Sequence, residues 1–144
     1  MIIIGDTSGL IAALNIANPE HQAARVALRE ASVTVVSPLV FAEIEHVITR
    51  NTDRNTAGQI NDWLLQQEGA MRILVPEVAA STLRKARTVQ ALYADLRLDL
   101  ADAVTVVLAE QYETDSVLTL DRRDFRAVRP LSSHPAFRLL PDDL

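Results

Sequence analysis

Four acidic residues stand in apolar surroundings along this chain. Asp6 follows a run of isoleucines, Glu43 follows Phe41-Ala42, Asp102 lies in an alanine- and valine-rich segment, and Asp121 follows a second apolar run. Burying an unpaired carboxylate is costly or shifts its pKa, so each of these charges needs compensation. A divalent cation shared by several carboxylates would supply it. The sequence therefore predicts that Asp6, Glu43, Asp102 and Asp121 meet at one metal site.

The donor atoms of this predicted site indicate which metal it would take and what reaction it would catalyse. The chain has no cysteine, and His21, His46 and His134 are scattered without ligand spacing. Carboxylate oxygens select hard ions, so we expect Mg²⁺ or Mn²⁺, as one ion or as two roughly 3.5–4 Å apart. Such a centre activates water and offsets charge on a phosphate, which is the chemistry of phosphodiester hydrolysis.

Several acids of the chain, although not Glu43, also have a simpler interpretation as local structure. Asp6 has the position of a helix N-cap, and Asp121 with Asp124 has the spacing of a turn. Asp99 and Asp102 are spaced as N-cap and third helical residue, so Asp99 is expected to cap the helix while Asp102 points inward. Asp99 as an outer contact to metal or water is the less favoured alternative. Glu43 has no comparable structural role.

Neighbouring polar residues are candidates for supporting roles. Thr7, Ser8 and Thr119 could hydrogen-bond the carboxylates or could act only in capping and turns. Arg122 and Arg123 stand beside Asp121, where arginine side chains could contact phosphate or simply be solvated.

Hydrophobic periodicity predicts the elements that position these residues. Apolar, β-branched runs predict strands at residues 1–5, 33–36, 72–75, 116–119 and near 137–140. Helical spacing predicts six helices: 6–16, one opening at Pro19, 38–50, one that follows a polar loop at 51–56 and ends at Gly69, 77–95 and 99–111. Residues 121–125 are predicted to form a turn, and Trp63 of the fourth helix is expected in the core.

The alternation of strands and helices predicts an α/β fold. We expect a three-layer α/β/α sandwich with a mainly parallel sheet of four or five strands, and a single domain over residues 1–144. Ligands of such sheets bind beyond the carboxyl ends of the strands. Asp6 and Asp121 directly follow strands, and Glu43 and Asp102 lie early in helices, so all four can share that edge.

Composition narrows the class of protein. A net charge of -5 disfavours binding of nucleic acid by bulk electrostatics alone, although it does not exclude a nucleic-acid substrate. No apolar run approaches the roughly 20 residues that span a bilayer, and the N-terminal run lacks the features of a secretory signal. Without cysteine the chain suits a reducing compartment, so we expect a soluble, cytoplasmic protein that makes no membrane contact.

Four segments of the sequence together carry a family resemblance. They are Asp6-Thr7-Ser8-Gly9-Leu10, Phe41-Ala42-Glu43-Ile44, Leu100-Ala101-Asp102-Ala103 and Leu118-Thr119-Leu120-Asp121-Arg122-Arg123-Asp124-Phe125. In order and spacing they resemble the PIN-domain family, and the resemblance is closest to VapC-type toxins of bacterial toxin–antitoxin pairs. It covers essentially the whole chain.

The resemblance implies a Mg²⁺-dependent endoribonuclease that cuts structured RNA such as tRNA or rRNA. It also implies a cognate VapB-type antitoxin, which would inhibit by covering the acidic pocket, and a homodimer or a larger toxin–antitoxin assembly. The family's four acids fall on Asp6, Glu43, Asp102 and Asp121, none of them substituted. Asp99 departs from the family pattern, which tends to a small or uncharged residue there.

Two other functions compete with this hypothesis. One is a PIN-like module that binds RNA or protein without cutting, which the four intact acids disfavour. The other is a receiver-like phosphoacceptor, which also gathers acids around Mg²⁺. That alternative lacks support because the only lysine, Lys85, lies in the middle of a predicted helix and not after a late strand.

Overall fold

The computed structural model describes all 144 residues and alternates strands with helices. The strands are β1 (Ile2–Gly5), β2 (Val33–Val35), β3 (Ile73–Leu74), β4 (Ser116–Leu118) and β5 (Arg138–Leu140). The helices are α1 (Thr7–Leu14), α2 (His21–Glu30), α3 (Pro38–Asn51), α4 (Arg54–Gly69), α5 (Ala80–Leu92), α6 (Leu100–Gln111) and α7 (Arg122–Ala127). A short 3₁₀ helix at Ala94–Leu96 links α5 to α6. No helix is both long enough and apolar enough to cross a membrane.

The five strands form one sheet in the order β3-β2-β1-β4-β5, and every neighbouring pair is parallel. The central strand β1 is hydrogen-bonded on both sides, with Ile4 opposite Val35 of β2 and Val117 of β4. The chain first builds outward from β1 to β2 and β3 and then returns to the other side of β1. The order therefore reverses between β1 and β4, which is where ligands bind in open sheets of this kind.

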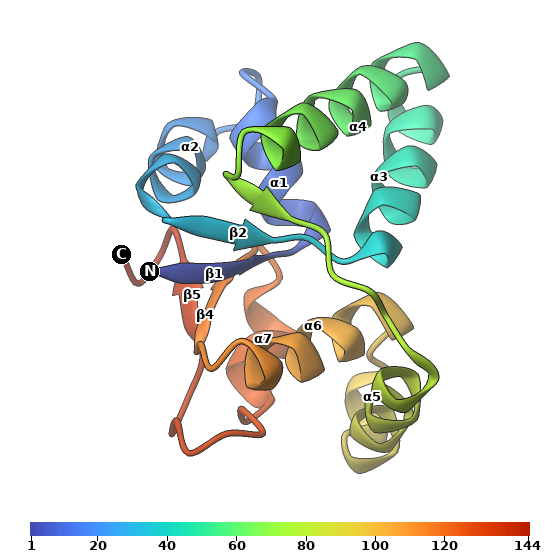
Figure 1. Ribbon diagram of the computed structural model, residues 1–144, viewed down its shortest axis with the longest axis vertical. Coiled ribbons are helices and arrows are strands. Elements are labelled where there is room, and N and C mark those ends of the chain that lie inside the picture. The colour runs from blue at the N-terminus through green and yellow to red at the C-terminus, as the bar shows by residue number, and fades with distance from the viewer.

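Helices cover both faces of the sheet, as Figure 1 shows: α1 to α4 lie on one side and α5 to α7 on the other. Each face has its own hydrophobic core. Leu10, Ile44 and Leu64 belong to the first core, and Val104 and Phe125 belong to the second. Because both faces are covered, the strands consist mostly of apolar residues. The α/β prediction and its three-layer arrangement are confirmed, with five parallel strands.

Two local predictions are wrong. The polar stretch 51–56 is mostly helical, because Asp53 accepts a hydrogen bond from the backbone N–H of Thr56 at 2.7 Å and starts α4 at Arg54. The predicted turn at 121–125 is the beginning of α7, capped by Asp121. Both errors come from polar residues that cap helices as readily as they form loops.

Candidate active site

Asp6 leaves the end of β1 and is almost fully buried, with 3% of its surface exposed. Its side chain makes no capping hydrogen bond to α1. Instead its Oδ2 accepts from the Thr119 hydroxyl at 2.7 Å and from the Ser8 hydroxyl at 3.3 Å, while its buried Oδ1 has no partner. Burial raises the pKa of Asp6 to about 6, although the hydrogen bond from Thr119 acts in the opposite direction. The N-cap position alone therefore does not explain this carboxylate.

Asp99 and Asp102 divide their roles as the spacing predicts. Asp99 is the N-cap of α6, because its Oδ1 accepts from the backbone N–H of Asp102 at 2.8 Å. The Asp102 side chain is left free and buried at the edge of the sheet. Burial, followed by the negative charges of Asp6, Asp99, Asp121 and Glu43, raises the pKa of Asp102 to about 9. The carboxylates of Asp6, Asp121 and Glu43, which belong to other segments of the chain, are therefore near enough to oppose ionisation of Asp102.

Glu43 lies in the second turn of α3 and is half-buried. Ser37 starts this helix by accepting from the backbone N–H of Leu39 at 3.1 Å, with Pro38 as the first helical residue. Burial raises the pKa of Glu43, and the carboxylate of Asp99 raises it further. The α3 helix therefore brings Glu43 to the same group of acids.

Asp121 and Asp124 complete the group from α7. Asp121 caps the helix by accepting from the backbone N–H of Asp124 at 3.4 Å, and burial raises its pKa. One carboxylate oxygen each of Asp102, Asp121 and Asp124 lie within 4.8 Å of one another. Sequence reasoning missed Asp124 because its spacing from Asp121 also fits an ordinary turn. The signal was present, since a cap and the third helical residue face the same side.

Hydroxyl groups connect the Asp6 side of the site to the Asp121 side. The Thr119 hydroxyl, besides donating to Asp6, accepts from the backbone N–H of Asp121 at 2.9 Å. Ser8 similarly accepts from the backbone N–H of Leu120 at 2.9 Å. Of the three hydroxyls expected to hydrogen-bond a site carboxylate, Ser8 and Thr119 do so, whereas the buried hydroxyl of Thr7 has no hydrogen-bond partner. One hydrogen-bond network thus links the Asp6 carboxylate at the end of β1 to the backbone of Asp121 after β4.

No lysine or arginine forms an ion pair with these acids, and His46 is the one basic side chain whose charge lowers the pKa of a member, Glu43. Lys85 pairs with Glu110 at 2.6 Å, on the helices α5 and α6. Arg122 is held by Glu20 and Asp142. The acids are an all-oxygen donor set that includes an unpartnered buried oxygen, and a hard divalent cation fits such a set.

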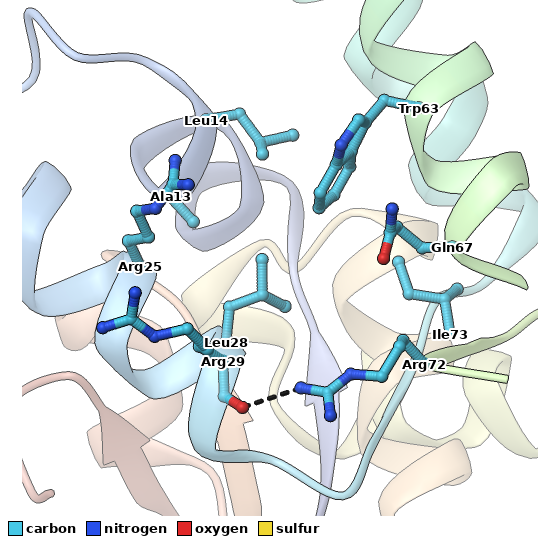
Figure 2. Close-up of a pocket in the computed structure, with 9 residues that line it drawn as sticks. All are labelled: Ala13, Leu14, Arg25, Leu28, Arg29, Trp63, Gln67, Arg72 and Ile73. Atoms are coloured by element: carbon cyan, nitrogen blue, oxygen red, sulfur yellow. Dashed lines mark hydrogen bonds between the residues drawn. The ribbon is translucent and has the colours of Figure 1, made fainter. Parts of the chain in front are cut away.

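A separate cavity of about 350 Å³ lies between α1, α2 and α4, and contains none of the acids (Figure 2). Trp63 of α4 faces it with 37% of its surface exposed, so the expectation that Trp63 belongs to the core is wrong. Arg72 crosses the floor of the cavity to donate to the carbonyl oxygen of Arg29 at 2.7 Å. The lining is Ala13, Leu14, Arg25, Leu28, Arg29, Trp63, Gln67, Arg72 and Ile73.

Comparison with known proteins gives consistent matches to one family. Residues 3–130 match the model of the PIN domain. The chain is 38% identical over 138 residues to Ribonuclease VapC26 of Mycobacterium tuberculosis, covering 90% of this chain and 93% of that protein.

Two solved structures share the fold at low sequence identity. VapC20 of Mycobacterium tuberculosis, described as a sarcin–ricin loop cleaving toxin, has a TM-score of 0.73 at 18% identity, over 85% of this chain and 92% of that one. VapBC2 of Rickettsia felis, bound to a promoter DNA fragment, has a TM-score of 0.67 at 13% identity, over 96% of this chain and 98% of that one. With its matched sequence and its five-stranded parallel sheet, the chain belongs to the PIN domain family and resembles the VapC proteins within it.

Proposed function

We propose that this protein is a metal-dependent endoribonuclease and the toxin of a toxin–antitoxin pair. The observation that carries the proposal is the buried Asp102 carboxylate, which has no lysine or arginine partner, has an oxygen within 4.8 Å of oxygens of Asp121 and Asp124, and has its pKa raised by the charges of Asp6 and Glu43 as well. Similarity to a VapC ribonuclease over nearly the whole chain supports RNA as the substrate. A purely binding module would not need a buried carboxylate whose pKa is raised to about 9.

Mg²⁺, or Mn²⁺ in its place, is the cation we assign to this centre. Asp6, Glu43, Asp102 and Asp121 would hold it, and Asp124 adds an oxygen on the α7 side. When bound, the ion supplies Lewis-acid stabilisation of phosphate charge and lowers the pKa of water. The donor set fits this ion because it is made only of oxygens.

The chain's own residues set the geometry of this centre. Thr119 and Ser8 hold one oxygen of Asp6 by hydrogen bonds, which leaves the other oxygen free for the ion. Asp99 fixes the first turn of α6 and so the direction of Asp102. Exposed arginines at the rim, of which Arg123 is the nearest in sequence to Asp121, would hold the RNA backbone.

We propose structured RNA, such as tRNA or rRNA, as the substrate and a VapB-type antitoxin as the inhibitor. The relative named as cleaving the sarcin–ricin loop and the VapBC pair support these assignments. A homodimer, a cytoplasmic location and a single domain over residues 1–144 belong to the same proposal.

The cavity beside Trp63 suits the antitoxin. It combines an exposed indole and leucines with Arg25 and Arg29, so it fits an amphipathic segment that carries acidic residues. The helix α1 runs from Asp6 at the active site to Leu14 at this cavity, and its eight residues span about 12 Å. A partner seated in the cavity is close enough to reach over the acidic pocket.

The test is cleavage of purified RNA with Mg²⁺ and with EDTA, using the wild-type chain and the variants Asp6→Asn and Asp102→Asn. We expect Mg²⁺-dependent cuts that EDTA abolishes. The cleavage rate of each variant should fall by at least about 100-fold. This is more than the fall expected when a group that only orients a metal ligand is removed. Asp62→Asn, an exposed acid of α4, is the matched control and should cleave normally. Full cleavage by both site variants, or RNA binding without cleavage by the wild type, would refute the proposal.

A further inference from the structure

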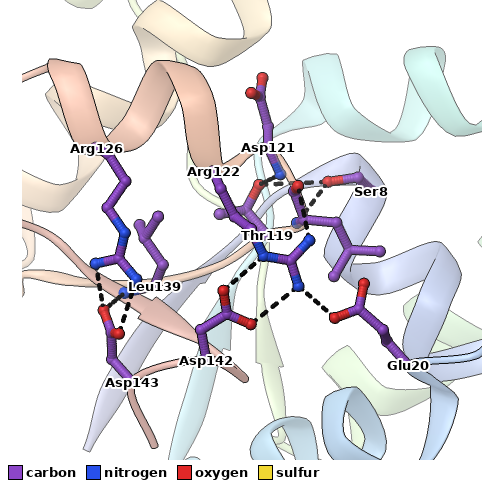
Figure 3. A network of polar contacts seen from close by, with 10 residues as sticks. Ser8, Glu20, Thr119, Asp121, Arg122, Arg126, Leu139, Asp142 and Asp143 are labelled. Atoms are coloured by element: carbon purple, nitrogen blue, oxygen red, sulfur yellow. Dashed lines mark hydrogen bonds and ion pairs between the residues drawn. The ribbon is translucent and has the colours of Figure 1, made fainter.

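The side chain of Arg122, the residue after Asp121, is held by three separate segments of the chain (Figure 3). Its Nε donates to Asp142 Oδ2 at 2.5 Å and its Nη2 donates to Asp142 Oδ1 at 2.9 Å. The same Nη2 also donates to Glu20, and Nη1 donates to the carbonyl oxygen of Leu120 at 3.5 Å. Glu20 directly precedes α2 and Asp142 follows β5, so one guanidinium joins elements distant in the sequence.

We propose that Arg122 is a positioning residue for the metal centre. It ties the start of α7 to α2 and to the chain after β5, and thereby holds the Asp121 carboxylate beside Asp102. This inference rests on the proposed function, in which Asp121 is a metal ligand.

The turn that carries Asp121 is held from two sides. On the inner side, the backbone N–H of Asp121 donates to the Thr119 hydroxyl at 2.9 Å. On the outer side, Arg122 extends to its two carboxylate partners, and Figure 3 shows the Asp121 carboxylate pointing the opposite way from that guanidinium. Loss of the outer contacts would leave the turn held only from the inner side, by the hydrogen bonds of Asp121 to Thr119 and of Leu120 to Ser8.

The helix α7, which follows Asp121, depends on contacts with the rest of the protein for its position. α7 has only six residues, and helices of this length have little stability of their own. Phe125 anchors it in the core, and Arg122 anchors its first turn. A two-point pair between arginine and a carboxylate fixes orientation as well as distance. Both groups of the pair are charged at neutral pH, and the hydrogen bond from Arg122 lowers the pKa of Asp142 further.

Direct binding of RNA phosphate is the competing role for Arg122. The contacts argue against it, because the guanidinium donors are directed at oxygens of the protein itself. The adjacent Arg123 is exposed and makes no ion pair. The two roles predict opposite effects when Glu20 and Asp142 are neutralised: a positioning Arg122 loses its hold, and an RNA-binding Arg122 is freed.

The experiment compares the full-length wild-type chain with Arg122→Gln and with the double variant Glu20→Gln/Asp142→Asn. Mn²⁺ affinity is measured by calorimetry, and kcat and KM are measured for RNA cleavage. We expect both variants to bind Mn²⁺ about tenfold more weakly, the lower end of the range for groups that orient metal ligands. kcat should fall while KM for RNA stays within about twofold. Combining all three substitutions should add little, because they remove one shared network.

Arg126→Gln is the matched control, because Arg126 lies on the same helix and pairs with Asp143 at 2.7 Å without contacting Glu20 or Asp142. It should keep wild-type affinity for Mn²⁺. If Arg122→Gln does not fold, as judged by circular dichroism, the double variant carries the test, since it retains the arginine.

Four results would overturn the inference. Wild-type Mn²⁺ affinity in the double variant together with a raised KM in Arg122→Gln would make Arg122 an RNA contact. A lower melting temperature with unchanged Mn²⁺ affinity in both variants would make the network merely structural. If the wild-type chain neither binds Mn²⁺ nor cleaves RNA, the proposed function itself is refuted. If the wild type does both and the two variants behave like it, only the role of Arg122 is refuted.

Discussion

Asp102 is the residue whose protonation is most strongly altered by the fold. Its pKa rises from an ordinary value of 3.8 to about 9, first through burial and then through the surrounding carboxylates. The folded chain therefore holds a proton that the unfolded chain releases between these two values. Over that range of pH, ionisation opposes folding of the metal-free protein, and Asp6, with a pKa raised to about 6, acts in the same direction.

This sign leads to a prediction for metal-free protein. In EDTA, the melting temperature of the wild type should fall as the pH rises from 5 to 8. Asp102→Asn should be more stable than the wild type at pH 8 by at least about 1 kcal/mol, the equivalent of somewhat less than one pKa unit. For a chain of this length that is a rise of about 2–4 °C, measurable by differential scanning calorimetry.

Saturating Mg²⁺ provides the control for this measurement. It should stabilise the wild type more than Asp102→Asn, because a cation that binds only the folded state stabilises it by an amount that grows with the logarithm of its affinity. Equal melting temperatures at pH 5 and pH 8 in EDTA, or a less stable Asp102→Asn at pH 8, would contradict the electrostatic account of the site.

Sequence reasoning at this scale identified acids in apolar contexts and, in Ser8 and Thr119, the hydroxyl partners of Asp6. Asp6, Asp99 and Asp102 could be assigned because strand ends and capping spacing are local properties. The contacts of Arg122 could not, because they depend on segments brought together only by folding, whereas Asp124 was missed although its spacing from Asp121 is local. Arg122 in particular has the sequence position of a phosphate contact, and its partners lie 102 and 20 residues away.

At the scale of elements, the contact between α1 and β4 determines how closely Asp6 approaches the Thr119 side of the site. Gly9 lies against the backbone of β4, and a Cβ built there would come within 2.3 Å of the carbonyl oxygen of Leu118. The backbone N–H of Asp6 donates to that same oxygen at 3.0 Å. Any side chain at Gly9 would therefore push α1 away from the strand that carries Thr119.

We expect Gly9→Ala to destabilise the protein by about 1–3 kcal/mol, the cost of overpacking against a backbone that cannot move aside. Cleavage by the protein that remains folded should also fall, because Asp6 would shift relative to Thr119. Urea unfolding and an RNA cleavage assay measure the two effects.

Gly58→Ala is the matched control. Gly58 lies within α4, and a Cβ there would meet nothing within 4 Å, so the substitution should stabilise the helix by about 1 kcal/mol. Equal stability of the two variants would show that the close approach at Gly9 does not restrict packing.

The order of the helices and strands could be predicted from the periodicity of apolar residues, but some of their first and last residues could not. Buried strands such as Ile2–Gly5 are short apolar runs bounded by turn residues, which is a strong local signal. The start of α4 was missed because Asp53 and its neighbours are polar and read as a loop until the capping hydrogen bond is seen. α7 was missed because it has only six residues and buries only Phe125.

At the scale of the whole molecule, the strand order is what brings the site together. The sequence predicts parallel strands, but it does not reveal that β4 lies beside β1 and not beside β3. Because β1 and β4 are neighbours, Asp6 and Asp121 follow the two strands between which the strand order reverses. The position of β4 depends on packing against both faces of the sheet. The sequence therefore predicts that the acids share one edge of the sheet, but it does not predict which side chains contact one another there.

The same architecture separates the acidic site from the cavity beside Trp63, which lies at the far end of α1. In our proposal the first carries catalysis and the second carries antitoxin binding, so single substitutions should uncouple them. Trp63→Ala should weaken antitoxin binding by at least about 30-fold, equivalent to the 2 kcal/mol typical of a buried interface tryptophan, while RNA cleavage stays normal.

Asp102→Asn should show the converse, with cleavage lost and antitoxin affinity changed little. Leu65→Ala is the matched control for Trp63→Ala, because Leu65 is also exposed on α4, at 52%, but does not line the cavity. Calorimetric titration of the toxin with its antitoxin and a cleavage assay on the same preparations measure both properties. Undiminished antitoxin affinity in Trp63→Ala would place the inhibitor elsewhere on the molecule, because an indole at the centre of that contact could not be removed without loss.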